Sequence, residues 1–552
     1  MSVLAQRNAS LEALERTQFD ALVVGGGIVG TGIARDLALR GLKVALVEKN
    51  DLASGTSSRP TRLIHGGLRY LEMFDFGLVR TDMREREVLL HLAPHLVQPL
   101  QFLMPMYGRG VLYRAKLQAG MQLYDALSFD KSLPTRQWLN KRQLLRVEPG
   151  LSPTALQGAW QFYDGQLSLV ERLVVENALD AAQHEAVVAT CAHVVEFLRD
   201  DLGGVVGARV QDRLSGQSLD VRARLTVNAT GPWLDLTTQT LRPGRRPLLR
   251  LTKGVHLVTP SATRKAHVLF AQKDGRLFFV IPWLGYSLVG TTDTDYVGDP
   301  ADAAATDEDV EYLVSEARSV FPDGQFDQIY YAYAGVRALV RIEHVAEGKV
   351  SRKHALYDHA RRDGVPGLVS VVGGKITGYR AIAEEVGDLV ARKLRWPRRE
   401  LPTDAEPLPG GHLRDLETYV IDEVWPRAAA FGLDREQAEH LGSMYGSMTP
   451  AVLARIERNQ GLAERVCPNE PTIAAQLEHA VESEWALSLG DVLLRRTALG
   501  LRACQALDCL DTVVERVAPL LGWDTAERAS QVEAYRRELA PMRRFSREPA
   551  TV

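Results

Sequence analysis

The sequence contains little that would indicate a metal site or an oxidising compartment. Its 552 residues include only four cysteines, at positions 191, 467, 504 and 509, and their spacing matches neither a metal-ligand motif nor a disulfide framework. Cys504 and Cys509 lie five residues apart on a predicted helix, where packing is the expected role. We therefore expect reduced cysteines, no metal site and a cytoplasmic protein.

Long apolar runs and an excess of one charge are also lacking. No run of about 18 apolar residues occurs, so no transmembrane helix is expected. Residues 1–18 are polar and lack the apolar core of a signal peptide. The net charge of −3 argues against a nucleic-acid partner. With 45% hydrophobic and 24% charged residues, the chain has an ordinary globular composition, and its length suits two or three domains.

The strongest motif lies within residues 19–48, FDALVVGGGIVGTGIARDLALRGLKVALVE, which predict a strand, a glycine turn, a helix and a second strand. Gly25, Gly27 and Gly30 fit the pattern G-x-G-x-x-G. The first glycine allows the tight turn, the second lets the backbone approach a pyrophosphate, and the third lets helix and strand pack closely. Glycine turns also occur for purely structural reasons, so the flanking elements carry the prediction.

Those flanking elements favour dinucleotide binding. The helix beginning near Ile28 would direct its free N–H groups and its positive dipole end at the pyrophosphate. Glu48 ends the second strand, 18 residues after Gly30, where a carboxylate can accept hydrogen bonds from a ribose diol.

Two further segments suit a cofactor. Residues 51–72, DLASGTSSRPTRLIHGGLRYLE, contain small hydroxyl residues that suit a loop crossing a phosphate or a flavin edge, and two glycines that would let backbone lie against a flat ring. Arg69 can meet an anion and Tyr70 can supply a hydroxyl. Further along, ATG at 229–231 and GGK at 373–375 each follow an apolar strand.

Together these residues resemble the FAD-dependent glycerol-3-phosphate dehydrogenase family, within the amino-acid-oxidase-like flavoproteins. The resemblance rests on GGGIVG, TSS…IHGGLRYLE, ATG, IPW…GTTD, GVR and GGK, which occur in that order. It implies an α/β FAD-binding Rossmann-like domain with an antiparallel-sheet substrate domain and a C-terminal all-α cap domain. It also implies that sn-glycerol 3-phosphate is oxidised to dihydroxyacetone phosphate and that the electrons pass from FAD to a quinone.

The expected domain layout combines this resemblance with composition. Residues 1–18 would be an N-terminal tail, and 19–396 would interleave the FAD-binding and substrate-binding domains. Residues 397–411 are rich in proline and glycine and would form a linker, and 412–552 would form the helical domain. The substrate sheet would come mainly from about 90–160 and 245–345.

The resemblance also assigns roles. Arg337 of GVR would hold the substrate, with Arg69 and Tyr70 as further substrate contacts, and Lys375 would lie near the reacting flavin edge. His256 is the first candidate for general base and His65 the second, since an imidazole titrates near neutral pH. The expected cofactor contacts are Gly25, Gly27, Ile28, Gly30, Glu48, Thr56, Ser57, His65, Gly66, Gly67, Leu68, Val194, Ala229, Gly231, Gly374, Lys375, Ile376 and Thr377.

Several alternatives stay open. Arg337 can instead form an internal ion pair with a glutamate such as Glu343. An oxidase would pass electrons to oxygen, although the family's oxidases tend to carry an insertion before YYAYAGVR that this chain lacks. A flavin-binding RNA-modifying or regulatory protein would need a basic, aromatic patch on the cap, where acids are mixed with arginines.

Contacts with a membrane or a second copy also stay open. Residues 107–129 interleave Arg109, Arg114 and Lys116 with apolar residues, which suits either a membrane interface or packing on the protein itself. The resemblance favours a peripheral position on the inner face of the cell membrane, because the quinone is lipid-soluble. A homodimer through the cap is a further expectation.

Overall fold

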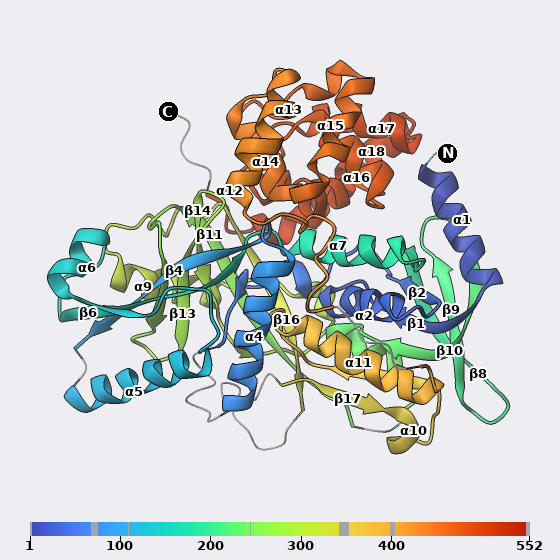
Figure 1. Cartoon of the computed structure of the whole chain (residues 1–552), viewed down its shortest axis with the longest axis horizontal. Coiled ribbons are helices and arrows are strands. Elements are labelled where there is room, and N and C mark those ends of the chain that lie inside the picture. The colour runs from blue at the N-terminus through green and yellow to red at the C-terminus, as the bar shows by residue number, and fades with distance from the viewer. Residues whose placement is uncertain are drawn as a thin grey trace.

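A computed structural model describes residues 3–67, 75–108, 110–242, 244, 246–341, 353–397 and 403–547, apart from the side chains of 111–114. Two β-sheets lie next to each other, and a layer of helices from the C-terminal part of the chain covers one end of both (Figure 1). The N-terminal half and the segment up to α11 (Tyr379–Leu394) build the sheets.

The first sheet contains the glycine motif. Its order is β17 (Ala355–Asp358), β18 (Leu368–Val372), β10 (Ser218–Asn228), β1 (Gln18–Val24), β2 (Val44–Val47) and β7 (Val187–Ala189). The strands from β18 to β7 are parallel, and β17 is antiparallel to β18. The parallel strands are apolar along most of their length, as expected when both faces of a sheet are covered. The hairpin of β8 (Ala192–Arg199) and β9 (Val205–Asp212) extends β10.

Helices cover one face of this sheet. Helices α2 (Ile28–Leu39), α7 (Val170–Gln183) and α11 share a core with Ala21 and Val23 of β1. The alternating Leu22 and Val24 belong to the core of the opposite face, because successive side chains of a strand point to opposite sides.

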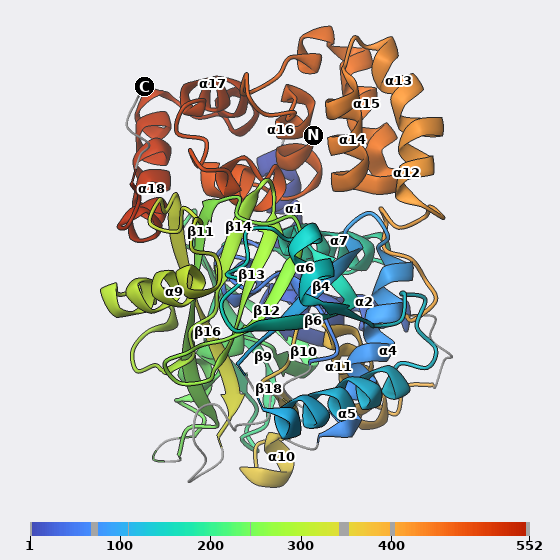
Figure 2. The ribbon, with the colours of Figure 1, turned by 90° about the vertical axis from the view of Figure 1, so that its left-hand side faces the viewer.

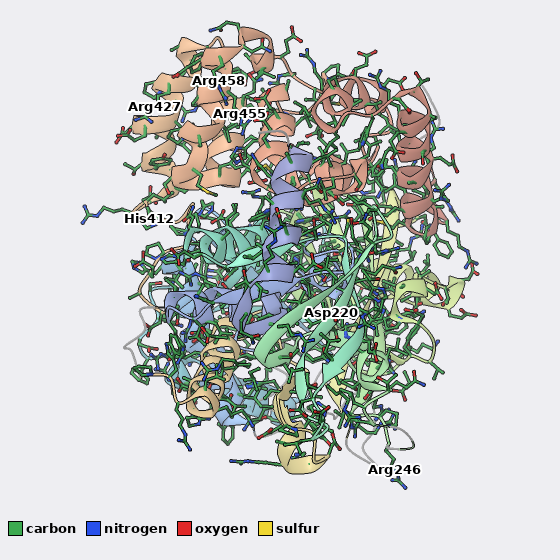
Figure 3. The ribbon with its side chains drawn as sticks, turned by 90° about the vertical axis from the view of Figure 1, so that its right-hand side faces the viewer. Asp220, Arg246, His412, Arg427, Arg455 and Arg458 are labelled. Atoms are coloured by element: carbon green, nitrogen blue, oxygen red, sulfur yellow. The ribbon has the colours of Figure 1, made fainter. Side chains whose placement is uncertain are left out.

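The polar, helix-prone N-terminal segment, expected as a tail, forms a helix, α1 (Val3–Arg16), that packs on the rest of the protein. Leu14 packs in the core of the first sheet, whereas Val3 packs with side chains of the C-terminal helices. Arg7 forms a buried ion pair with Asp212 at 2.6 Å. Figure 3 shows α1 running along the sheet towards the helical layer.

The second sheet is larger and mainly antiparallel. Its order is β15 (Thr294–Asp295), β11 (Leu249–Pro260), β14 (Tyr286–Gly290), β13 (Leu277–Trp283), β12 (Ala266–Phe270), β4 (Val97–Tyr107), β6 (Leu156–Leu167) and β3 (Leu63–Ile64). Strand β16 (Tyr331–Val340) pairs with β11, and β5 (Gln137–Asn140) pairs with β6. Helices α6 (Lys141–Val147) and α9 (Asp307–Val320) cover one part of it, and α4 (Phe76–Leu92) and α5 (Val111–Leu127) cover another (Figure 2).

The helical layer begins at α12 (Leu416–Tyr419) and continues through α13 (Trp425–Ala430), α14 (Arg435–Tyr445), α15 (Thr449–Arg458), α16 (Ala474–Ser483), α17 (Leu510–Leu521) and α18 (Thr525–Arg543). The prediction of a helix through Cys504 is wrong. A turn separates Leu501 from α17, and Gln505 (φ 51°) and Ala506 (φ 57°) adopt left-handed conformations that interrupt a helix. A bond from the Tyr535 hydroxyl to the Gln505 carbonyl at 2.8 Å fixes this turn.

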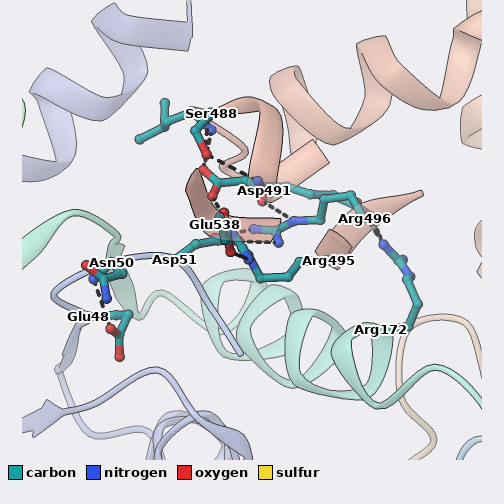
Figure 4. A network of polar contacts seen from close by, with 11 residues as sticks. Glu48, Asn50, Asp51, Arg172, Ser488, Asp491, Arg495, Arg496 and Glu538 are labelled. Atoms are coloured by element: carbon teal, nitrogen blue, oxygen red, sulfur yellow. Dashed lines mark hydrogen bonds and ion pairs between the residues drawn. The ribbon is translucent and has the colours of Figure 1, made fainter. Parts of the chain in front are cut away.

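Buried ion pairs attach the helical layer to the first sheet. Asp51, just after β2, accepts hydrogen bonds from Arg495 Nε at 2.7 Å and from both terminal nitrogens of Arg496 at 2.9 and 2.7 Å (Figure 4). A second pair joins Arg172 of α7 to Glu484 at 2.7 Å. Removing one partner of such a pair leaves an uncompensated buried charge.

Among the described residues, none of the helices combines the length and the apolar character needed to cross a membrane.

The ion pair between Arg172 and Glu484 should make the free energy of unfolding depend on pH. Burial alone would raise the pKa of Glu484, but the Arg172 guanidinium and His479 lower it to about 2. Because this value is below the unfolded one, the stabilisation is present above about pH 4.5 and is lost as the pH falls towards 2; it amounts to about 3 kcal/mol. Glu484→Gln should therefore destabilise the protein at pH 7, and its difference from wild type should shrink below pH 4.5.

Urea unfolding at several pH values measures this effect. Glu423→Gln is the matched control, since Glu423 pairs with Arg427 at the surface and should contribute less than about 1 kcal/mol. A Glu484→Gln deficit that stays constant down to pH 3 would contradict the assignment.

Candidate active site

Three bends of the chain meet at one edge of the first sheet. Gly25 follows β1, Ala229 follows β10 and Gly373 follows β18, and these strands are parallel neighbours. The Ala229 N–H donates to the Val24 carbonyl at 2.9 Å, and a Cβ on Gly25 would lie 2.7 Å from the Ala229 oxygen. Ligands of open α/β sheets bind outside the carboxyl ends of the strands. The sheet thus brings together three segments that are far apart in the sequence.

The first bend, residues 25–30, has the pattern of a phosphate-binding turn, and we call it the cradle. Gly27 precedes α2, which begins at Ile28. A Cβ at Gly30 would collide with the Gly25 carbonyl oxygen, so helix and turn approach as closely as glycine allows. The Ile28 N–H donates to Ser57 Oγ at 3.0 Å, which places the loop of Thr56 and Ser57 across the start of the helix. Backbone N–H groups at a positive helix end are the donors that suit the pyrophosphate of FAD.

Glu48 closes the same bend from β2. Its carboxylate accepts hydrogen bonds from the Gly26 N–H at 2.7 Å and the Asn50 N–H at 2.9 Å. Burial raises the pKa of Glu48, while these two bonds oppose the rise. The Ala192 N–H donates to the Glu48 carbonyl at 2.7 Å, which sets β8, with Val194 two residues on, beside β2. The structure thus brings Glu48 and the start of β8 together, and their contacts with the ribose and adenine stay predictions.

The third bend meets the loop after β3. The His65 N–H donates to Thr377 Oγ1 at 3.2 Å, and a Cβ on Gly374 would lie 3.8 Å from Val29 of α2. Gly66 and Gly67 are buried next to His65, and Ile376 is half-buried next to Thr377. The segments expected to contact the flavin are therefore adjacent.

Lys375 has a defined partner. Its ammonium lies 2.5 Å from a carboxylate oxygen of Asp82 on α4, which offsets much of the charge it brings to the site. Gly231 lies two residues past Ala229, at the start of a short helical turn. Leu68, Arg69 and Tyr70 lie outside the described residues.

Arg337 lies on β16 and extends over β11. It shares a sheet face with Gly335 and Gly254, which are paired residues of the two strands. A Cβ at Gly254 would collide with the guanidinium, so glycine provides the space for it. The guanidinium donates to Thr291 Oγ1 at 2.8 Å and to the Thr292 carbonyl at 3.3 Å.

A carboxylate completes the surroundings of Arg337. Asp293 Oδ1 lies 3.1 Å from its guanidinium, and the Arg337 side chain remains 17% exposed. The sequence-based alternative of an internal ion pair is thus realised with an aspartate, and Glu343 lies outside the described residues. These bonds and the ion pair with Asp293 fix the orientation of the guanidinium.

His256 lies two residues from Gly254 on β11 and is buried. Its Nε2 is 3.0 Å from Thr61 Oγ1, and its ring stacks on Tyr333 with centroids 5.1 Å apart. Its Nδ1 has no hydrogen-bond partner among the described residues. Burial, followed by the charges of Arg337 and Arg62, lowers the pKa of His256 well below its ordinary value. The imidazole is therefore neutral near pH 7.

One loop connects the two sheets at this point. Thr56 Oγ1 donates to the Val336 carbonyl at 2.7 Å, and the Tyr333 hydroxyl donates to the Pro60 carbonyl at 2.9 Å. Together with the contact between Thr61 and His256, these bonds hold residues 56–61 along β16. The dinucleotide edge of the first sheet and the Arg337 face of the second sheet therefore meet at this loop.

The sequence assigned no role to the residues that contact Arg337, Lys375 and His256 in the structure. Thr291 and Asp293 belong to the GTTD motif, and the presence of this motif in the resemblance, ahead of GVR, was the available signal. Asp82 and Thr61 have no comparable signal, because only the folded chain brings them to Lys375 and His256.

Comparison with known families covers nearly the whole chain. Residues 20–385 match the family described as FAD dependent oxidoreductase. Residues 401–528 match the family described as the C-terminal domain of alpha-glycerophosphate oxidase.

Individual relatives are similar over their full length. A protein of Synechocystis named glycerol-3-phosphate dehydrogenase is 39% identical over 537 residues, covering 95% of this chain and 96% of the relative. Glycerol-3-phosphate dehydrogenase 2 of Mycobacterium tuberculosis is 38% identical, covering 96% and 90%. The crystal structure of glycerol-3-phosphate dehydrogenase from Bacillus halodurans, complexed with FAD, superposes with a TM-score of 0.81 at 29% identity, covering 100% and 99%.

Proposed function

Since this chain belongs to the FAD-dependent glycerol-3-phosphate dehydrogenase family, we propose that it oxidises sn-glycerol 3-phosphate to dihydroxyacetone phosphate and passes the electrons to a quinone. The observation that carries the proposal is similarity over the full length of both chains to enzymes of that name. Some relatives at 32–33% identity are named aerobic glycerol-3-phosphate dehydrogenase. When bound, FAD supplies the hydride acceptor, and the protein orients the substrate and screens it from water.

In this proposal Arg337 binds the substrate through its phosphate or its reacting hydroxyl. The bonds to Thr291, Thr292 and Asp293 hold the guanidinium in one orientation before substrate arrives. The guanidinium would meet a phosphate as a fixed positive charge, and charge-assisted bonds to the phosphate would replace some of its present bonds. Arg69 and Tyr70 remain further candidates for substrate contacts.

His256 is the first candidate to take the hydroxyl proton. The lowered pKa keeps the ring neutral near pH 7, and a neutral imidazole carries one nitrogen that can accept a proton. His65, beside Thr377, is the second candidate.

Replacing Arg337 tests its role. Arg337→Ala should lower kcat/KM for glycerol 3-phosphate by about 10- to 100-fold or more, because charge-assisted hydrogen bonds to the substrate are lost. The bound FAD should be retained, since Arg337 is not a cradle residue. Arg341→Ala, four residues along and exposed, is the matched control and should keep normal turnover. Wild-type turnover in Arg337→Ala would remove Arg337 from the site.

Anaerobic titration tests the substrate and the acceptor. Glycerol 3-phosphate should bleach the visible absorbance of the bound flavin, and glycerol without phosphate should not. Adding a soluble quinone analogue to the bleached enzyme should restore the absorbance faster than adding air does. Failure to bleach with FAD bound would remove the substrate assignment, and rapid reoxidation by oxygen with release of peroxide would favour the oxidase.

The proposal includes contact with a membrane surface through α5. This helix lies at the end of the molecule away from the helical layer (Figure 2). Leu123 is exposed on it, and Phe129, just beyond it, is 78% exposed. Lys116 is also exposed, whereas Arg109 and the side chain of Arg114 lie outside the described residues. Apolar and basic side chains on one helix suit the surface of an anionic membrane.

The homodimer stays a prediction, which the particle mass in solution would test.

Co-sedimentation with anionic lipid vesicles measures the membrane contact. The double variant Leu123→Ser/Phe129→Ser should bind several-fold less protein than wild type, because less apolar surface is buried in the interface. Leu202→Ser is the control, since Leu202 is exposed on the distant β8–β9 turn. Absence of wild-type binding at low salt would end the membrane proposal.

A further inference from the structure

Three of the four cysteines converge within the helical layer. The ligand atoms of Cys467, Asp508 and Cys509 all lie within 4.8 Å of one another. Cys504 lies outside this group of three, but its thiol interacts with the Asp508 side chain. Cys467 lies more than 35 residues before the other members, so the sequence spacing does not reveal the cluster. None of these residues has a role in the active site described above.

The backbone around the cluster is fixed by tertiary contacts. Cys467 lies in a loop closed by bonds from the Glu470 N–H to the Cys467 carbonyl at 3.2 Å and from the Val466 N–H to the Thr472 carbonyl at 2.9 Å. Cys509 immediately precedes α17. The turn of Cys504 is held by the bond from Tyr535 to the Gln505 carbonyl. The backbone positions of the three cysteines are therefore fixed by hydrogen bonds and by the start of a helix.

The donor set suits zinc. Zn²⁺ is bound tetrahedrally by thiolates at about 2.3 Å and carboxylate oxygens at about 2.0–2.2 Å, which places neighbouring ligand atoms about 3.5–3.8 Å apart. For Cys467, Asp508 and Cys509, contraction from separations below 4.8 Å requires only side-chain adjustment, and the Cys504 thiol would have to move towards them to become the fourth ligand. Magnesium and calcium prefer oxygen ligands, and iron–sulfur clusters generally use four cysteines. Three sulfurs and one carboxylate match the preference of zinc best.

Burial and charge are also consistent with a metal. Cys467 is 2% and Cys509 5% exposed, whereas Cys504 is half-buried and Asp508 is exposed, which leaves a route of entry. Cys509 lies at the N-terminal end of α17, and because burial raises the pKa of its thiol, a metal would have to displace the thiol proton on binding. Arg502, close in sequence, pairs with Glu470 at 2.8 Å and adds positive charge near the cluster.

We propose that Cys467, Cys504, Asp508 and Cys509 bind one zinc ion, which ties the Cys467 loop to the start of α17. All four cysteines are free thiols in the structure. A disulfide between Cys467 and Cys509 would use two of the groups and leave Asp508 and Cys504 beside it without a role. Zinc uses all four, and the proposal is independent of the reaction at the FAD site.

Cobalt provides the test, since Co²⁺ takes the same sites and absorbs visible light. Full-length protein, reduced and stripped with a chelator, should bind one Co²⁺ per chain, with thiolate charge-transfer bands and the intense visible bands of tetrahedral geometry. Zinc should displace the cobalt stoichiometrically. Cys467→Ser and Cys509→Ser should lose these bands, and Cys191→Ser should keep them, because Cys191 lies by the first sheet.

Further measurements keep the test decisive if a core cysteine variant fails to fold. Asp508→Asn alters an exposed side chain and should fold while binding Co²⁺ at least about tenfold more weakly. Zinc should raise the unfolding temperature of wild type more than that of Asp508→Asn. Absence of cobalt bands in reduced wild type, unchanged binding in Asp508→Asn, or a Cys467–Cys509 disulfide in the protein purified without reductant would each overturn the proposal.

Discussion

The parallel register of β1, β10 and β18 is the constraint on which the site depends. Backbone hydrogen bonds pair Val24 with Asn228 and Asn228 with Ser370, so the three strands end side by side. Each strand continues into a bend that contains glycine. Because the strands are neighbours, the three bends lie next to one another at that edge of the sheet. The close approach at Gly30 then places the start of α2 directly beyond the end of β1. A cofactor cradle therefore follows from sheet pairing rather than from a single motif.

The second sheet supplies the groups that the cradle lacks. Residues 56–61 leave the cradle, run along β16 and bond to Val336, Tyr333 and His256. Movement of this loop would shift the start of α2 and the face that holds Arg337 together. Because the guanidinium is already oriented by Thr291 and Asp293, little conformational entropy remains to be lost when an anion binds. Cofactor and substrate groups are thus positioned by shared contacts.

The sequence predicted the fold class, the cofactor and the family, and all three are confirmed. These properties leave local signals: glycines at fixed spacing, apolar strands and a helical C-terminal pattern. The partners of Arg337 and Lys375, the packing of α1 on the rest of the protein, and the convergence of Cys467 with Cys509 depend on contacts between distant segments. Periodicity could not reveal them, and it misread the turn at Cys504, where a tertiary bond overrides helical spacing. The individual site roles stay predictions.

The carboxylate of Asp51 has a consequence for the order in which the molecule matures. Its guanidinium partners follow it by 444 and 445 positions. At about 5–20 residues per second, a ribosome needs roughly 20 to 90 s to deliver them. Until then the carboxylate of Asp51 lacks the partners that it has in the folded protein, and α7 lacks its contacts with residues 491–496. This buried link between distant positions can form only after most of the last quarter of the chain has been made.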